Sequence, residues 1–180
     1  MTEELAVTDW AYAAGFVDGE GCIAVVRSFI PGRGRYVYGV HVVVANGDHG
    51  VLDWMRSTWG GWVVGVATGQ GLARPSWTWR CSTGLAAKPF LTGIRPWLRI
   101  KGPQCDNALA MIELLQRGRR TLGRAPLPQA WLDEQEMHYW KQRELNHRGT
   151  SVFARRPMHS PRQINRQRAL AANQGLLTGQ

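Results

Sequence analysis

Glu20 is the residue best placed for chemistry, because it stands between Gly19 and Gly21 directly after a stretch with helical character. Flanking glycines permit unusual backbone angles and the close approach of a ligand or a second chain. A carboxylate in such a position offers hard oxygen ligands to an ion such as Mg²⁺. A glycine-flanked acid is also common as a plain turn, so residue 20 alone leaves both interpretations open.

The residues around Glu20 extend the pattern. Residues 13–23 read Ala, Ala, Gly, Phe, Val, Asp, Gly, Glu, Gly, Cys, Ile. They resemble the LAGLIDADG motif of homing endonucleases in its variant that ends Asp, Gly, Asp or Glu, Gly. Residues 90–101 resemble the later segment of that family that ends in a functional lysine, here Lys101. Asn46 resembles the Asn or Gln that follows the family's second strand, and the resemblance covers roughly residues 8–117.

The resemblance implies a site-specific homing endonuclease that hydrolyses both strands of DNA with Mg²⁺, or with another divalent cation such as Mn²⁺. Glu20, Lys101 and Asn46 would be its catalytic residues, and Glu20 with the carbonyl of Gly19 would bind the metal. Lys101 would lie near the scissile phosphate, and Asn46 would position solvent. We expect Asp18 to have a structural role. Without the resemblance, Lys101 could be an ordinary helix-end or surface cation and Asn46 a turn residue.

The motif occurs once in this sequence, and family members with one copy act as homodimers. The resemblance therefore implies a partner that is a second copy of the chain, paired through the motif helices, and a near-palindromic DNA target. On a helix, small residues at positions i, i+3, i+4 and i+7 form a stripe that another helix can approach closely. That stripe is predicted at Ala11, Ala14, Gly15 and Asp18.

Periodicity and turn signals predict an α+β domain in which helices cover one face of a four-stranded antiparallel sheet and the other face stays open. This is the LAGLIDADG homing endonuclease fold that the resemblance implies. The first helix should follow Thr8 as its cap, and a short second helix should follow Asp48. Strands are expected at residues 22–29, 36–45, 62–67 and 76–82, and later helices at about 84–97, 104–117 and 128–145.

The open sheet face is the expected DNA-binding surface, because a two-stranded ribbon fits the major groove. Alternation along the second strand directs Tyr38, Val40, Val42 and Val44 to the core. The same rule turns Trp77, Trp79 and Cys81 inward. In the first strand the family register puts the largely apolar set Cys22, Ala24, Val26 and Ser28 on the DNA side. The predicted DNA-binding residues of the domain are Ser28, Arg33, Arg35, His41, Thr78 and Arg80.

The charge balance agrees with a polyanionic partner, since 22 Lys and Arg oppose 13 Asp and Glu for a formal charge of +9. Nucleic acid and an anionic membrane surface are the two candidates. Apolar runs are too short for a membrane span, and the N-terminus lacks the form of a signal peptide. The three cysteines are an odd number with no short pairing, which favours a reducing compartment over a disulfide framework. We therefore expect an intracellular protein, in a bacterial cytoplasm, a phage-infected host or an organelle, that is not secreted.

Composition divides the chain into an endonuclease domain at 5–146 and a basic tail at 147–180, which we expect to be poorly ordered when free. Arg148, Arg155 and Arg156 are its predicted DNA contacts, although a soluble terminus without a role is the simpler alternative. Two other functions stay open. One is a LAGLIDADG protein that binds nucleic acid without cleaving it, as an RNA maturase or a DNA-binding regulator. The other is an interaction module that binds RNA nonspecifically.

Overall fold

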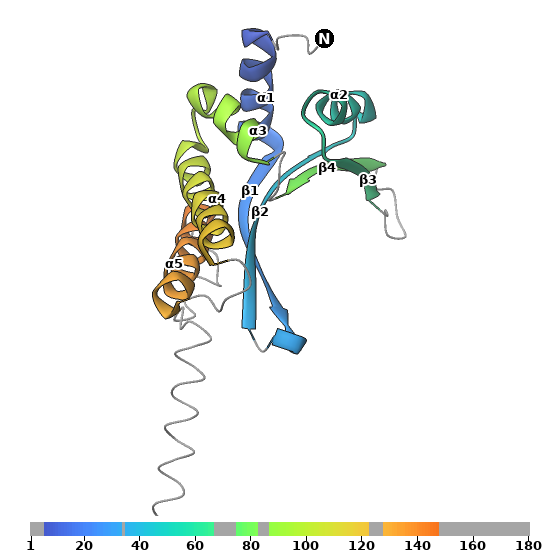
Figure 1. Ribbon diagram of the computed structural model, residues 1–180. Helices are drawn as coiled ribbons and strands as arrows, with labels where there is room; N and C mark the ends of the chain where they lie inside the picture. The colour runs from blue at the N-terminus through green and yellow to red at the C-terminus, as the bar shows by residue number, and fades with distance from the viewer. Residues whose placement is uncertain (1–5, 34, 67–74, 83–86, 123–127, 148–180) are drawn as a thin grey trace, which may run out of the picture. The chain divides into compact units, whose positions relative to one another are not determined.

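The computed structural model describes residues 6–33, 35–66, 75–82, 87–122 and 128–147 (Figure 1). These residues lie in the first of two units of the chain, Met1–His147. The second unit, Arg148–Gln180, includes the predicted contacts Arg148, Arg155 and Arg156 and lies outside the described residues. The helices are α1 (Val7–Glu20), α2 (His49–Trp59), α3 (Ala87–Ile94), α4 (Gly102–Leu122) and α5 (Gln129–Leu145), and the strands are β1 (Gly21–Ile30), β2 (Arg35–Asn46), β3 (Trp62–Val66) and β4 (Ser76–Ser82).

The four strands form one antiparallel sheet in the order β1-β2-β4-β3. Figure 1 shows α4 and α5 alongside the long β1–β2 hairpin and α2 above β3 and β4. The helices cover the sheet face that carries Val40, Val42 and Val44, all of which are completely buried. The predicted α+β class, with helices on one face of a four-stranded antiparallel sheet, is therefore confirmed.

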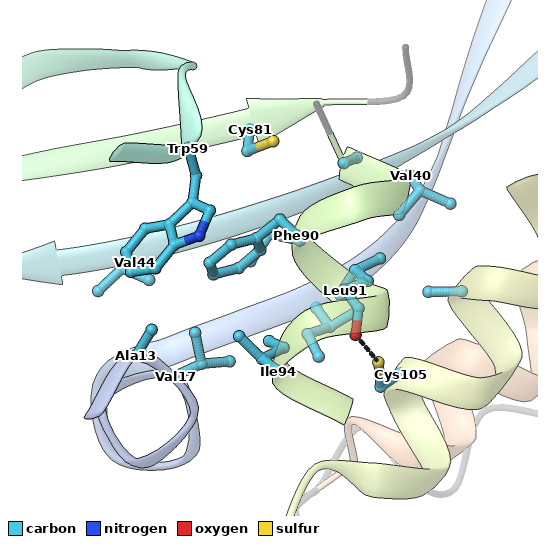
Figure 2. Close-up of a cluster of buried hydrophobic side chains, with 14 of the residues drawn as sticks. Ala13, Val17, Val40, Val44, Trp59, Cys81, Phe90, Leu91, Ile94 and Cys105 are labelled. Atoms are coloured by element: carbon cyan, nitrogen blue, oxygen red, sulfur yellow. Dashed lines mark hydrogen bonds between the residues drawn. The ribbon is translucent and has the colours of Figure 1, made fainter. Parts of the chain in front are cut away.

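The core forms where α3 lies between the sheet and the other helices. Figure 2 shows Phe90 of α3 beside Trp59 of α2 and Ile94 of α3 beside Val17 of α1, and all four side chains belong to the buried core. All three cysteines are free, and burial raises the pKa of Cys81 to about 11 and that of Cys105 to about 12. Buried thiols with raised pKa values are poor nucleophiles, so Cys81 and Cys105 contribute to packing.

A side chain caps the start of α2 but not the start of α1. Asp48 caps α2 as predicted, because its Oδ1 accepts hydrogen bonds from the backbone N–H groups of Gly50 and Val51 at 2.7 and 3.2 Å. The prediction of Thr8 as the cap of α1 was wrong. That helix begins at Val7, and its first turn is closed by a backbone hydrogen bond from Asp9 to Ala6 instead of by a side chain.

A buried polar network joins α5 to α4 and to the outer edge of β1. The side chains of Gln142 and Asn146 donate to the carbonyl oxygen of Ile23 at 2.6 and 2.8 Å. Asn107 of α4 donates to Gln142 Oε1 at 2.8 Å. Since β1 is an edge strand, these bonds occupy a carbonyl that would otherwise face solvent or another strand. The network fixes β1 only three residues after Glu20.

Candidate active site and nucleic-acid interface

Glu20 is the last residue of α1, is exposed, and stands where the helix passes directly into β1. The turn depends on Gly21, whose N–H donates to the carbonyl of Val17. A Cβ at Gly21 would lie 2.7 Å from Val17 O and 2.8 Å from Val17 Cα, closer than real Cβ atoms come. The glycine that follows Glu20 is thus required by close approach of the backbone, and Glu20 and Gly19 are left at the surface.

Asp18 and Lys101 fix the last turn of α1. The Asp18 carboxylate accepts hydrogen bonds from the backbone N–H groups of Arg99, Ile100 and Lys101 at 2.6, 3.1 and 2.9 Å. In return, Nζ of Lys101 donates to the carbonyls of Val17, at 2.9 Å, and of Asp18. We call this arrangement the Asp18–Lys101 clamp. It holds the end of α1 against residues 99–101. These contacts agree with the structural role expected for Asp18.

Lys101 lies at the same helix end as Glu20, which is where the resemblance would put it. Its side chain differs from a surface cation in being only 4% exposed, with its ammonium against the carboxyl end of α1. A positive charge there is favoured by the helix dipole. Lys101 therefore contributes positive charge at the carboxyl end of α1 from a buried position and stabilises that helix end.

Asn46 ends β2, and its Oδ1 accepts a hydrogen bond from the backbone N–H of Asp48 at 2.7 Å. This is an Asx turn that leads into α2, so the turn interpretation of Asn46 describes its local contact. The pairing of β1 with β2 also locates Asn46 relative to Glu20. Gly21 pairs with Val44, and β2 continues for two residues beyond that pair. Asn46 consequently lies at the same end of the sheet as Glu20.

The Asp18–Lys101 clamp predicts a specific pH dependence. Burial alone would raise the pKa of Asp18, but backbone hydrogen bonds from residues 99–101 and the charge of Lys101 lower it overall. A carboxyl whose pKa is lowered on folding stabilises the protein above its unfolded pKa of about 3.9 and loses that effect as the pH falls through its folded value. Asp18→Asn should thus lower the free energy of unfolding at pH 7 by roughly 3 kcal/mol.

Urea unfolding at pH 7 and near pH 3 tests this prediction, with Asp9→Asn in the first turn of α1 as the matched control. The difference between wild type and Asp18→Asn should shrink in acid, whereas Asp9→Asn should differ little from wild type at either pH. A difference for Asp18→Asn that stays constant across this range would contradict a role for the ionised carboxylate.

The open face of the sheet alternates with the core face as predicted. On β1, Cys22 and Ser28 are exposed and Ala24 and Val26 half-buried, while Ile23 and Val25 are buried. On the neighbouring strands Arg80 is exposed and His41 and Arg35 are half-buried. The side chain of Arg33 lies outside the described residues.

Thr78 was predicted to contact DNA, but the structure buries it. It is on the expected face but only 5% exposed, because it pairs with Ala45 of β2 on one side and Val64 of β3 on the other. A short side chain on an interior strand is covered by its neighbours. The expectation of an accessible Thr78 was therefore wrong.

The charged side chains that the strands place on the open face are all basic. None of the four strands contains Asp or Glu, whereas β2 and β4 contribute Arg35 and Arg80 to the open face. The pKa of His41 is lowered by burial and by the nearby charge of Arg80. Arg80 also lies in a cross-strand row with Cys22, Val43 and Trp62, which is the row nearest Glu20. Trp62 is exposed, as expected from the sequence, but it was not among the predicted DNA-binding residues, although alternation at the start of β3 would place it on this face.

The exposed face of α1 differs from the small-residue stripe predicted for it. Ala14 is completely buried in the core and Asp18 belongs to the Asp18–Lys101 clamp, so neither is available to a second helix. The exposed positions that share one face are Thr8, Tyr12, Gly15 and Gly19. Their spacing of i, i+4, i+7 and i+11 is the signal that could have identified this face. A Cβ at Gly15 or Gly19 would have nothing within 4 Å, so the folding of one chain does not require these glycines.

One chain offers few metal ligands. In the part of the chain that the structure describes, no three His, Cys, Asp or Glu side chains are grouped closely enough to hold an ion. The same residues include no helix with the length and apolar character needed to cross a bilayer.

The four-stranded antiparallel sheet and its helices match the fold of solved LAGLIDADG homing endonucleases. Solved structures with this fold include the homing endonuclease I-CvuI in complex with its target, at a TM-score of 0.63 and 20% identity over 81% of this chain and 87% of that one. The archaeal intron-encoded homing endonuclease I-Vdi141I, complexed with DNA, has a TM-score of 0.63 and 14% identity over 81% and 88% of the two chains.

The homing endonuclease I-TnaI is similar at a TM-score of 0.54 and 18% identity, over 79% of this chain and 94% of that one. No protein-family model and no curated protein sequence matches the chain. At these identities the likeness establishes the fold, and it confirms the resemblance to LAGLIDADG homing endonucleases at that level.

Proposed function

We propose that this protein is a metal-dependent, site-specific DNA endonuclease that acts as a homodimer on a near-palindromic target. The observation that carries the proposal is the exposed Glu20 at the end of α1, at the edge of an open sheet face without a single acid in its strands. A carboxylate that could bind a cation thus lies beside a surface suited to a polyanion. I-CvuI and I-Vdi141I, which have the same fold, were each solved with DNA.

Two observations support pairing of two chains. Gly15 and Gly19 leave open space on the exposed face of α1, which lets a second backbone approach. The chain also spans only 43% of the LAGLIDADG homing endonuclease I-GzeII and 47% of I-SmaMI, each solved with a DNA target. The matched part of this chain corresponds to a little under half of each of those chains, so two copies of that part would cover a comparable length.

The oxygen ligands of Glu20 and Gly19 suit Mg²⁺ or Mn²⁺ only if two chains contribute them to one site. Glu20 and the Gly19 carbonyl provide hard oxygen ligands, which Mg²⁺ prefers, but no group of three His, Cys, Asp or Glu side chains that could hold an ion occurs among the described residues of one chain. Paired α1 helices would bring two Glu20 carboxylates together, and a cation would offset their repulsion. A bound ion supplies an activated water and stabilises negative charge on the phosphate. Divalent cations were present with I-CvuI, which was solved with Ca and with Mg.

The other residues of the site have supporting roles in this proposal. Lys101 adds positive charge beside Glu20 and, through the Asp18–Lys101 clamp, keeps the end of α1 in place. Asn46, at the same end of the sheet, orients solvent near the phosphate through its amide. No side chain is needed as a covalent nucleophile.

The β1–β2 hairpin sets the length of DNA that one chain covers. Ten residues of β1 at about 3.3 Å each extend about 33 Å, and DNA rises about 3.4 Å per base pair. Each half-site would therefore be about ten base pairs. Arg80 and His41 would contact bases near the centre of the target, Ser28 and Arg35 bases farther out, and Arg33 with Arg148, Arg155 and Arg156 the phosphate backbone.

The test is cleavage of a duplex recovered by binding selection from a randomised library with the full-length protein. In Mg²⁺ both strands should be cut near the centre of a near-palindromic sequence, and chelation of the metal should stop cleavage while protein-bound duplex is still detected. Stable binding of the selected duplex with no cut in either strand, in Mg²⁺ or Mn²⁺, would contradict the proposal. That result would favour a LAGLIDADG protein that binds nucleic acid without cleaving it.

A further inference from the structure

The open face of the sheet is mostly apolar, which is unusual for a surface that would contact DNA bases. On β1 it presents Cys22, Ala24 and Val26 before the first hydroxyl at Ser28. On β2 it presents Val37 and Val43. These residues form neighbouring rows, since Cys22 pairs with Val43, Ala24 with His41, Val26 with Gly39 and Ser28 with Val37.

Apolar side chains can distinguish bases in one way only. They neither donate nor accept hydrogen bonds, so the donor and acceptor pattern of the major groove gives them nothing to bind. Thymine alone presents a methyl group there. No Asp or Glu in the four strands opposes the close approach of this surface to a duplex.

We propose that this chain selects thymine-rich half-sites by packing the patch formed by Cys22, Ala24, Val26, Val37 and Val43 against thymine 5-methyl groups. The inference rests on the proposed function, because it supplies the base preference of that DNA-binding face. The patch extends from the row beside Glu20 along most of the hairpin. The thymines therefore lie on both sides of the centre of the target.

Arg80 fixes the register of this contact. Its side chain is exposed in the row of Cys22 and Val43, where it can donate two hydrogen bonds to O6 and N7 of a guanine. His41, in the next row, is half-buried and has a lowered pKa because of burial and of Arg80. One guanine near the centre with thymines outside it is the half-site that this arrangement of side chains matches.

The experiment removes the 5-methyl groups of thymine from the DNA and leaves the protein unchanged. The probe is the duplex recovered by binding selection with the full-length protein. It is synthesised in two forms, one with its thymines and one with uracil in place of every thymine in the region that the protein covers. Each methyl that is buried on binding should account for about a fourfold loss of affinity, since a buried methyl group corresponds to about 0.8 kcal/mol. Contacts in both half-sites should make the combined loss at least about tenfold. A duplex with uracil only in its flanks is the control and should bind like the thymine duplex.

A matched variant assigns the effect to the protein surface. Val43→Thr keeps the shape of the side chain and replaces one methyl with a hydroxyl, so it should reduce the ratio of uracil to thymine dissociation constants. Equal binding of the uracil and thymine duplexes, with the thymine duplex still cleaved, would overturn this inference alone. Failure to recover any duplex from the library would overturn it together with the proposed function.

Discussion

Glu20→Gln is expected to lower the rate of DNA cleavage at least about 1000-fold while leaving DNA affinity unchanged or slightly increased. Glutamine keeps the size of the side chain and removes its charge, so the variant loses a metal ligand without a change in packing. Glu20 is exposed and lies beside a surface that would meet DNA phosphates. Loss of its negative charge therefore removes repulsion instead of an attractive contact.

Single-turnover cleavage and duplex binding should be measured on the same preparations. Glu113→Gln on α4, whose carboxylate is 66% exposed and paired with Lys88, is the matched control and should cleave at the wild-type rate. Loss of binding in parallel with cleavage would indicate that residue 20 supports the DNA-binding surface and has no metal-binding role. Cleavage by Glu20→Gln within tenfold of wild type would remove Glu20 from the chemistry altogether.

Gly15→Leu is expected to convert the dimer into a monomer and to abolish double-strand cleavage, although the fold of each chain is kept. A side chain at Gly15 has nothing within 4 Å in the single chain, and leucine is a better helix former than glycine by about 0.7 kcal/mol. In a pair of closely packed α1 helices, the same side chain would occupy the space of the second backbone.

Sedimentation velocity measures the change of mass, and circular dichroism measures the helix content. Thr92→Leu, which adds a comparable apolar side chain at an exposed position of α3, is the control and should remain dimeric. A Gly15→Leu protein that is still dimeric and still cuts both strands would contradict pairing through this face of α1. Dimers could then form only through some other surface.

Local signals in the sequence predicted most of the fold, because the physical cause of each element is local. Alternation along β2 put Val40, Val42 and Val44 on the buried face, and Asp48 indicated where α2 begins. Pro96, which lacks a backbone N–H, explains why the predicted helix at 84–97 is in fact α3 followed by a short 3₁₀ turn, Arg95–Trp97.

The errors at Ala14 and Thr78 concern neighbours that are distant in sequence. Ala14 could face either a partner helix or its own core, and only the packing of α3 and the sheet against α1 decides between them. Thr78 has the alternation of an exposed residue, but Ala45 and Val64 cover it from the adjacent strands. Cross-strand neighbours of this kind cannot be inferred until the order of the strands is known.

The candidate site was predicted unevenly for the same reason. The glycines around Glu20 are a local signal, and the position of Glu20 at the helix end followed from them. The Asp18–Lys101 clamp joins residues more than eighty positions apart, so no spacing in the sequence indicates it. Resemblance put Lys101 near Glu20, whereas its burial and its contacts with the carbonyls of α1 came from the structure.

The measurement that tests the central claim most directly is cleavage by a mixed dimer of one wild-type and one Glu20→Gln chain, isolated with two different affinity tags. If two Glu20 carboxylates share bound metal across a twofold axis, the mixed dimer should bind the selected duplex normally. It should make no double-strand cut in Mg²⁺. The wild-type dimer carrying the same two tags should cut both strands. Double-strand cleavage by the mixed dimer at the rate of the wild-type dimer would contradict the account.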